Sequence, residues 1–450
     1  MLSVGIFSIL IRYFTRKFKD MTTDWKKVYS QPPPSFGHDM KQFYTMDPEY
    51  INLNNGSYGA TPKPVLDAVR EMGKEIEANP DLFHRLTYLP KLVDVRQRLA
   101  DFLKVKLDEV VLVTNASTGL NTVIRNFQWE TGDLIFTFTT TYPSILNTAQ
   151  VMADTPPHPT HIVTPLIFPT TKDAIVTLIE QVFDANPAPP KKKRVAIIDT
   201  LISDPGVLLP WKEIVQLCKQ RNIWSIVDAA HSIGQETGLD LTSAAPDFWV
   251  SNCHKWLSAK RAVAVLYVPK RNQNIVTSSI PTSLYYISPD KRNGAPNFVD
   301  QYVWTGTIDW TSNLTVTDAL DYRNWLGGEE KINAYCHDLA IKGGEALAKL
   351  LGTKVLDPNG EFTLNMVNVE LPFPVSFKRI DDLDTIVKRL LLEKYKGYSA
   401  YYIHNNAYWT RCSAQIWNTL EDFEKMGQIW LNVIGDITTQ FKEQTGCNTA

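Results

Sequence analysis

Short, almost continuous apolar runs recur through the first two thirds of the chain. They span residues 110–113, 134–138, 161–166, 195–198, 223–227, 248–250 and 262–268. Most are followed by polar or small residues, and segments with apolar residues at helical spacing separate several of them. Runs that are apolar on both faces are typical of buried strands in a mostly parallel sheet. The pattern therefore predicts an α/β fold in which helices cover the sheet.

The pattern changes in the last third of the chain. Apolar residues keep helical spacing from residue 311 to about 351, and strands are then expected at 366–371 and 398–403. The chain has 450 residues, of which 44% are hydrophobic, enough for two unequal domains. We expect an N-terminal arm at 1–50, extended and rich in proline, a large domain at 51–325, and a smaller α+β domain at 326–450.

Composition narrows the classes of partner and site. The 46 basic and 48 acidic residues give a net charge of −2, which offers no reason to expect nucleic acid or an acidic membrane as a partner. The five cysteines, at 218, 253, 336, 412 and 447, lack CxxC spacing. They predict neither a metal site nor a disulfide framework, and they favour a reducing compartment.

The N-terminus combines an apolar run at residues 2–11 with four basic residues between 12 and 19. The run is too short to span a bilayer, and the order is the reverse of that in a secretory signal, so no stable membrane insertion is expected. We expect a cytoplasmic protein. A mitochondrial presequence, a membrane-surface anchor, and a true start at Met21 are the alternatives.

Ionisable residues follow two neighbouring apolar runs. Asp228 and His231 follow the first, and His254 and Lys255 follow the second. Parallel α/β sheets bind ligands at the carboxyl ends of their strands. A desolvated lysine is a nucleophile for carbonyl groups, and pyridoxal phosphate chemistry needs such a lysine together with a carboxylate on the ring nitrogen. Lys255 and Asp228 fit this pair; taken singly, they also fit a surface lysine and a turn-capping aspartate.

Two further features favour anion binding. Residues 114–121, Thr-Asn-Ala-Ser-Thr-Gly-Leu-Asn, follow a strand and open a helix, a good site for phosphate, although serine and threonine also simply cap helices. Arg411 lies on an apolar, aromatic-rich strand, where burial is costly unless an anion meets it. Its partner is either a substrate carboxylate or a nearby aspartate.

In combination, Asp-Ala-Ala-His at 228–231 and Ser-Asn-Cys-His-Lys-Trp at 251–256 resemble the class V aminotransferases, which are fold-type I pyridoxal-phosphate enzymes. The resemblance extends from about residue 50 to about 420. Arg-Cys-Ser-Ala-Gln-Ile-Trp-Asn at 411–418 is similar to the isopenicillin N epimerase-like and fungal hercynylcysteine sulfoxide lyase subfamilies. The resemblance implies a mostly parallel seven-stranded sheet, pyridoxal 5′-phosphate as cofactor, an amino-acid substrate, and a homodimer with shared active sites in which the arm wraps around the second subunit.

The resemblance also implies roles for individual residues. The catalytic residues are expected to be Lys255, Asp228, His231 and Tyr142, the last stacking on the cofactor ring. Cofactor contacts are expected from Ser117, Thr118, Ser203 and His254, and from Thr307 of the neighbouring subunit. Substrate contacts are expected from Arg411, Ser57 and Tyr58, the last two in a tight glycine-rich loop that also has a plain interpretation as turn chemistry.

The implied reaction passes through a quinonoid at the substrate Cα. We expect a lyase that cleaves a C–S bond of a cysteine-derived sulfoxide or S-conjugate. An epimerase, an aminotransferase and a carbon–carbon bond-forming enzyme like those of the loline pathway are alternatives. Residues 369–410 contain no cysteine, which argues against a persulfide-forming desulfurase. A non-catalytic scaffold is disfavoured because Lys255, Asp228 and Arg411 are all present.

Overall fold

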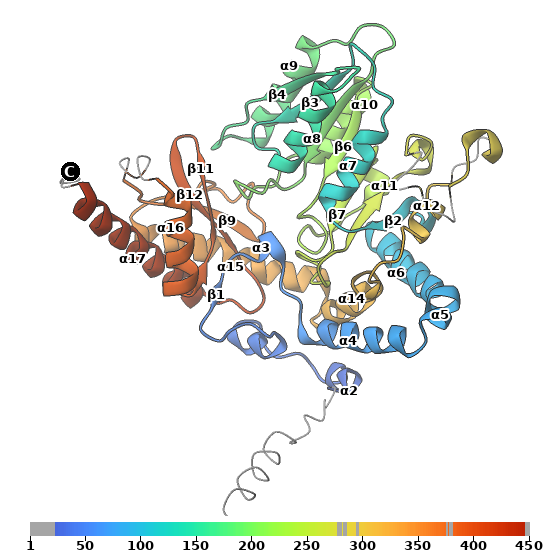
Figure 1. Cartoon of the computed structure of the whole chain (residues 1–450). Coiled ribbons are helices and arrows are strands. Elements are labelled where there is room, and N and C mark those ends of the chain that lie inside the picture. The colour runs from blue at the N-terminus through green and yellow to red at the C-terminus, as the bar shows by residue number, and fades with distance from the viewer. Residues whose placement is uncertain are drawn as a thin grey trace, which may run out of the picture.

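The computed structural model describes residues 23–445, apart from 277–280, 282–285, 294–296, 375–376 and 378–380. A seven-stranded sheet with helices on both faces adjoins a smaller layer of strands and helices built from the C-terminal third of the chain (Figure 1). The strand order is β2-β8-β7-β6-β5-β3-β4, in which β8 runs antiparallel to both of its neighbours. The strands are β2 (Val110–Val113), β3 (Leu134–Phe138), β4 (Thr160–Thr164), β5 (Arg194–Asp199), β6 (Trp224–Asp228), β7 (Phe248–Asn252) and β8 (Ala264–Tyr267). The predicted fold class is confirmed.

Alternate residues of each strand serve two hydrophobic cores. In β5, Val195 and Ile197 pack on the face covered by α7 (Ala116–Asn126) and α8 (Pro143–Asp154). Ala196 and Ile198 face the opposite side. That side is covered by α6 (Tyr88–Leu103), α9 (Lys172–Ala185) and α10 (Trp211–Gln220). Both faces are buried, which explains why the runs are apolar without alternation.

The smaller layer contains an antiparallel sheet, in the order β11-β12-β9. Its strands are β9 (Met366–Glu370), β11 (Ala400–His404) and β12 (Ala407–Ser413). Two long helices pack against it, α15 (Gly328–Leu351) and α17 (Leu420–Thr445). The short strands β1 (Ile51–Asn52) and β10 (Gly397–Tyr398) pair in parallel, so the chain near residue 51 joins the C-terminal layer. The domain boundaries given above stay a prediction.

The remaining helices connect the two layers and the arm. They are α2 (Trp25–Tyr29), α3 (Asn55–Tyr58), α4 (Lys63–Ala78), α5 (Pro80–Leu82), α11 (Leu241–Ala244), α12 (Asp300–Val303), α13 (Thr311–Leu314), α14 (Val316–Trp325) and α16 (Leu383–Arg389), with π-helical turns at Phe83–Thr87 and Leu390–Lys394. Within the described residues, no helix is both long enough and apolar enough to cross a membrane.

The arm differs from the sequence expectation. Its described part, residues 23–50, contains α2 and a 3₁₀ helix, and it packs on its own chain, where Met40 and Phe43 join a core with Tyr322 and Trp417. Apolar residues of the arm therefore find partners within the same chain, and the described part is helical in places and not extended throughout. Its wrapping around a second subunit stays a prediction. The candidate targeting segment, residues 1–20, lies outside the described residues.

Parallel pairing places the chemistry at one edge of the sheet. Asp199 ends β5 and Asp228 ends β6, and these two residues are register partners. Asn252 ends the next strand, β7. Because these strands run in the same direction, their polar ends meet at the carboxyl edge.

Candidate active site

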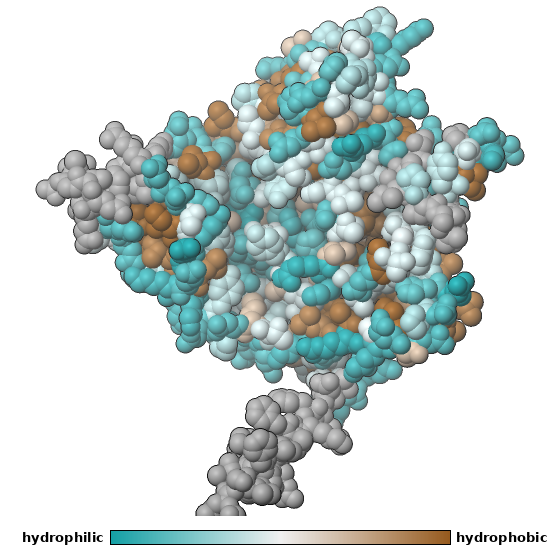
Figure 2. Space-filling model, in the orientation of Figure 1, coloured by the Kyte–Doolittle hydropathy of each residue, from teal (hydrophilic) through white to brown (hydrophobic). Residues whose placement is uncertain are grey.

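A cavity of about 170 Å³ opens at this carboxyl edge. In the space-filling view the molecule is hollowed near the centre of the face shown, and the surface there is mostly hydrophilic (Figure 2). The cavity brings together most of the residues expected from the sequence. These are Ser57, Ser117, Tyr142, Ser203, Asp228, His231, His254 and Lys255.

Lys255 is the cation at the centre of the cavity. It follows β7, and its Nζ lies 3.0 Å from Nε2 of His231. Burial is the main cause that lowers the pKa of Lys255 to about 8; the Arg411 charge acts in the same direction, while Asp228 opposes it. The lysine is therefore a free amine in mildly alkaline solution, the form that attacks carbonyl carbons and accepts protons.

Two buried carboxyl groups lie side by side at the inner end of the cavity. Burial raises the pKa of Asp228 to about 6, although its Oδ1 accepts a 3.0 Å bond from the amide of Ala230. Asp199 also lines the cavity, and burial followed by the Asp228 charge raises its pKa well above the usual range. Asp199 was not among the residues expected from the sequence, although it ends an apolar run in the same way as Asp228.

The N-terminus of α7 forms one wall. The Asn115 side chain caps this helix by accepting a 2.8 Å bond from the amide of Thr118, and the Asn252 side chain accepts from the amide of Ala116 at 2.9 Å. Ser117 faces the cavity and accepts a 3.1 Å bond from Ser144. The wall thus offers a hydroxyl group and the positive end of a helix dipole to an anion.

His254 stands beside the lysine in the same cavity. Its Nδ1 lies 3.3 Å from the carbonyl of Val263, so this nitrogen carries the proton. Burial lowers the pKa of His254 to about 4. The imidazole is therefore neutral near pH 7.

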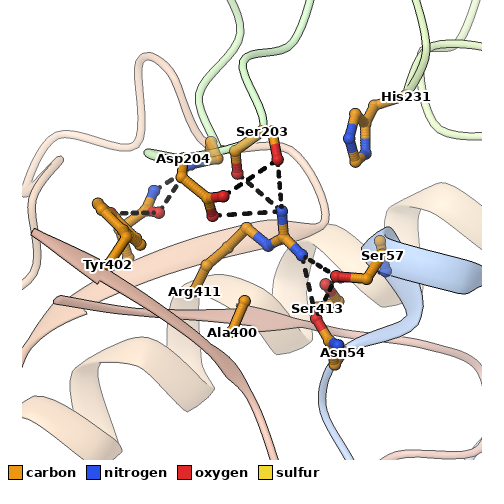
Figure 3. Close-up of polar contacts among 12 residues, drawn as sticks. Asn54, Ser57, Ser203, Asp204, His231, Ala400, Tyr402, Arg411 and Ser413 are labelled. Carbon is orange, nitrogen blue, oxygen red and sulfur yellow. Dashed lines mark hydrogen bonds and ion pairs between the residues drawn. The ribbon is translucent and has the colours of Figure 1, made fainter. Parts of the chain in front are cut away.

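Arg411 is 1% exposed and lies behind the serines of the cavity wall (Figure 3). Its Nη1 donates to the Ser203 carbonyl at 2.7 Å and is 3.5 Å from a carboxylate oxygen of Asp204. Its Nη2 donates to Asn54 at 3.0 Å and to Ser57 at 2.9 Å. The aspartate pairing that the sequence left open is therefore present, together with contacts to the cavity wall.

Four expected residues are not among those that line the cavity of this chain. The Thr118 hydroxyl turns to Thr114 and Asn115, and its residue lines a separate surface hollow. Tyr58 is 70% exposed and borders another hollow, because α3 turns it outward. Thr307 lies exposed on the loop before α13, and Arg411 lies behind the wall. The cofactor contact of Thr118 and the substrate contact of Tyr58 therefore stay predictions, because neither side chain lines this cavity in the single chain.

The described residues contain no cluster of three or more histidine, cysteine or acidic side chains that could hold a metal ion. The four cysteines among them are buried and unbridged, and none of them lines the cavity. The ionisable and hydroxyl-bearing side chains that line the cavity are one lysine, two histidines, two carboxyl groups, one tyrosine and several serines.

Residues 51–372 match the family described as aminotransferase class V. Over 445 residues the chain is 33% identical to an L-cysteine desulfhydrase-like protein, lolT1, of Epichloe uncinata, which covers 90% of this chain and 96% of the relative. It is 31% identical over 397 residues to the hercynylcysteine sulfoxide lyase of Schizosaccharomyces pombe, covering 88% and 97% of the two chains. Among solved structures, a cystine C–S lyase in complex with cysteine persulfide superposes with a TM-score of 0.71 at 19% identity, covering 85% of this chain and 97% of that one.

Proposed function

The chain belongs to the class V aminotransferase family, and from this premise we propose that it cleaves the C–S bond of a cysteine-derived amino acid. It is a pyridoxal-phosphate-dependent enzyme, as the two motifs around Asp228 and Lys255 predicted. The observation that carries the proposal is that a lysine with a lowered pKa and two buried carboxyl groups line one cavity.

The cavity residues fit pyridoxal 5′-phosphate. Lys255 would hold its aldehyde carbon, Asp228 its ring nitrogen, and Ser117 at the start of α7 its phosphate. Tyr142 lies at the cavity mouth and offers a flat ring to the ring of the cofactor. When bound, pyridoxal 5′-phosphate supplies an electron sink that stabilises negative charge at the substrate Cα.

The side chains then divide the work of the reaction. As a free amine, Lys255 would accept the Cα proton of the substrate. The substrate carboxylate is held at Arg411, where it replaces the weaker contacts to Ser57 and Ser203 with charged hydrogen bonds. His231, neutral and buried beside the lysine, shapes this face of the cavity.

Elimination is the outcome favoured over the alternatives. The Cα–H and Cβ–S bonds break, sulfur leaves with the bonding electron pair, and hydrolysis then yields pyruvate and ammonia. Among the described residues no cysteine lines the cavity, so none of them offers the departing sulfur a thiol acceptor there. Relatives named as sulfoxide lyase and desulfhydrase support the same outcome.

The test uses the purified, cofactor-loaded protein with a cysteine sulfoxide or S-conjugate. We expect equal amounts of pyruvate and of sulfur product, and a loss of about 10²–10⁴-fold or more in Lys255→Ala. Lys260→Ala is the matched control, because this lysine lines a different hollow. Inverted substrate without pyruvate would establish an epimerase instead, and amino-group transfer to a keto acid would establish an aminotransferase.

A homodimer with shared sites is part of the proposal. Exposed apolar side chains follow helical spacing along α5, the π-turn and α6, at Leu82, Leu86, Leu89 and Val93. Exposed apolar clusters of this kind are typical of subunit contacts. Thr307 is exposed in its own chain, where it is free to approach the cavity of a second copy.

A cytoplasmic location also stays a prediction, which fractionation of cells expressing the full chain would test.

A further inference from the structure

A tryptophan, a histidine and the central lysine form a connected line beside the cavity. The indole Nε1 of Trp256 donates to Nδ1 of His231 at 3.3 Å, and Nε2 of the same imidazole lies 3.0 Å from Nζ of Lys255. Trp256 and His231 are both buried. Each ring nitrogen of His231 therefore has its own partner, and the two nitrogens cannot exchange their donor and acceptor roles without losing a hydrogen bond.

The donor chemistry fixes where the protons are. An indole N–H only donates, so Nδ1 of His231 must present its lone pair. A neutral imidazole carries one N–H, which is then on Nε2 and points at Lys255. An ammonium group also only donates, so a protonated Lys255 and the Nε2–H of His231 would be two donors facing each other with no acceptor between them. The two hydrogen bonds can both form only when Lys255 is a neutral amine that accepts.

The charges around these groups act in the same sense. Burial is the largest cause that lowers the pKa of His231. The charges of Lys255, Arg411 and His254 lower it further. The Lys255 ammonium is disfavoured by burial and by Arg411, and is favoured only by Asp228 and Asp204. No nearby group makes an imidazolium favourable, so the neutral tautomer is the state to consider.

We propose that Trp256 is a positioning residue, whose indole N–H holds His231 as the Nε2–H tautomer so that His231 donates to Lys255 and keeps it a free amine. This deepens the proposed function, on which the use of that amine rests. Adding a proton to Lys255 would require His231 to move its own proton to Nδ1, which breaks the indole bond. Trp256 thereby influences the lysine without touching the cavity.

The indole itself is held rigidly. Its residue's carbonyl accepts a 2.8 Å bond from Nη1 of Arg323, and its ring packs with Leu201 and Met366. A matched control exists in Trp249, which is equally buried, but whose indole nitrogen has no partner among the described residues. Replacing either tryptophan with phenylalanine removes similar volume, yet only Trp256→Phe removes a hydrogen bond to His231.

The first test reads the proton position in the wild-type line. In the cofactor-free protein with ¹⁵N-labelled histidine at pH 9, above the midpoint expected for Lys255, we expect His231 to show protonated Nε2 and unprotonated Nδ1. His231→Gln serves only to identify the His231 signals by their absence. Observation of the Nδ1–H tautomer, or of an imidazolium, at this pH would overturn the proposal. This result does not depend on activity or on cofactor.

The second test measures the amine. We would follow the rate at which cofactor absorbance develops when pyridoxal 5′-phosphate is added to cofactor-free protein, as a function of pH. The wild-type midpoint is expected near pH 8. In Trp256→Phe the loss of one hydrogen bond should raise this midpoint by up to about one pH unit, which is a tenfold loss of free amine at fixed pH. In Trp249→Phe the midpoint should stay unchanged.

The outcomes separate the two claims. A midpoint that does not move in Trp256→Phe contradicts the positioning role. Absence of the absorbance band in the wild type at every pH contradicts the proposed function instead, while the tautomer measurement remains decisive for the line itself.

Discussion

At the scale of single residues, Asp199 and Asp228 set the charge state of the cavity. Both are buried, and they end neighbouring strands in register. Two adjacent buried carboxylates cannot both ionise at low cost, so one proton is retained between them. Burial raises the pKa of both groups, and the Asp228 charge further raises that of Asp199, whereas the Ala230 amide and the Lys255 charge favour the ionised form of Asp228. Asp199 is therefore the group that keeps the proton, which leaves Asp228 to ionise.

The sign of the resulting pH dependence follows from the raised pKa. The folded protein binds the Asp199 proton more tightly than the unfolded chain, so this group stabilises the fold fully below about pH 4. That contribution is lost as the pH rises towards the raised pKa, by about 1.4 kcal/mol per pH unit. In Asp199→Asn we expect the free energy of unfolding of cofactor-free protein to fall less between pH 5 and pH 7 than in the wild type.

Urea denaturation at the two pH values measures this difference. Asp94→Asn, at an exposed position on α6, is the control and should retain the wild-type pH dependence. An Asp199→Asn protein whose stability changes with pH as the wild type does would mean that Asp199 is already ionised at pH 5.

At the scale of elements, α14 fixes the loops that carry the lysine and the histidine. Arg323 of α14 donates to the carbonyls of Trp256 and Gly234, each at 2.8 Å, and both of its remaining contacts are to Glu329 of α15, at 2.6 Å. Gly234 has φ +83°, and a Cβ there would lie 2.5 Å from the backbone of Trp256. The two loops thus pack backbone to backbone under one guanidinium.

Arg323→Lys should therefore be poorly tolerated. A single ammonium cannot serve two carbonyls and a carboxylate in this planar arrangement, so we expect a loss of about 2–4 kcal/mol in the free energy of unfolding, with weaker cofactor binding. Chemical denaturation and cofactor titration measure the two effects. Arg98→Lys is the control, because its bond to Asp321 is partly exposed and should contribute about 1 kcal/mol or less. Equal losses in both variants would contradict the bridging role.

At the scale of the whole molecule, the apolar row on α5, the π-turn and α6 is the surface where we expect the subunit contact. Leu86 is 70% exposed at the middle of this row. Leu86→Glu should convert the expected dimer to monomers, because a buried unpaired carboxylate is costly at a subunit contact. Activity should fall with it, since Thr307 would no longer reach the cavity of a partner.

Light scattering together with turnover measurements tests this expectation. Ile403→Glu, at another exposed apolar position on β11, should change neither property. A monomeric Leu86→Glu protein with full activity would show that each chain holds a complete site, and a monomeric wild type would remove the dimer from the proposal.

Much of the fold was readable from the sequence because its signals are local. Strands buried on both faces produce continuous apolar runs wherever they occur, and the long helices repeat their apolar residues every three or four positions. The helical turns of the arm were not predicted, because its polar composition conceals Met40 and Phe43, whose core includes Tyr322 and Trp417 from the far end of the chain. The glycine-rich loop was expected to be a tight turn. In the structure it contains the short helix α3, which directs Ser57 into the cavity and Tyr58 towards the solvent.

The sequence by itself determined the fold class, the family and the lysine–aspartate pair, because these depend on residue type and spacing at the ends of strands. Only the tertiary structure decided which groups surround that pair. Arg411 meets Asn54 across 357 positions, and Asp199 becomes the neighbour of Asp228 through strand pairing. Trp256 reaches His231 through the packing of two loops. Desolvation, proton position and side-chain direction are properties of such assembled neighbours, and no short stretch of sequence contains them.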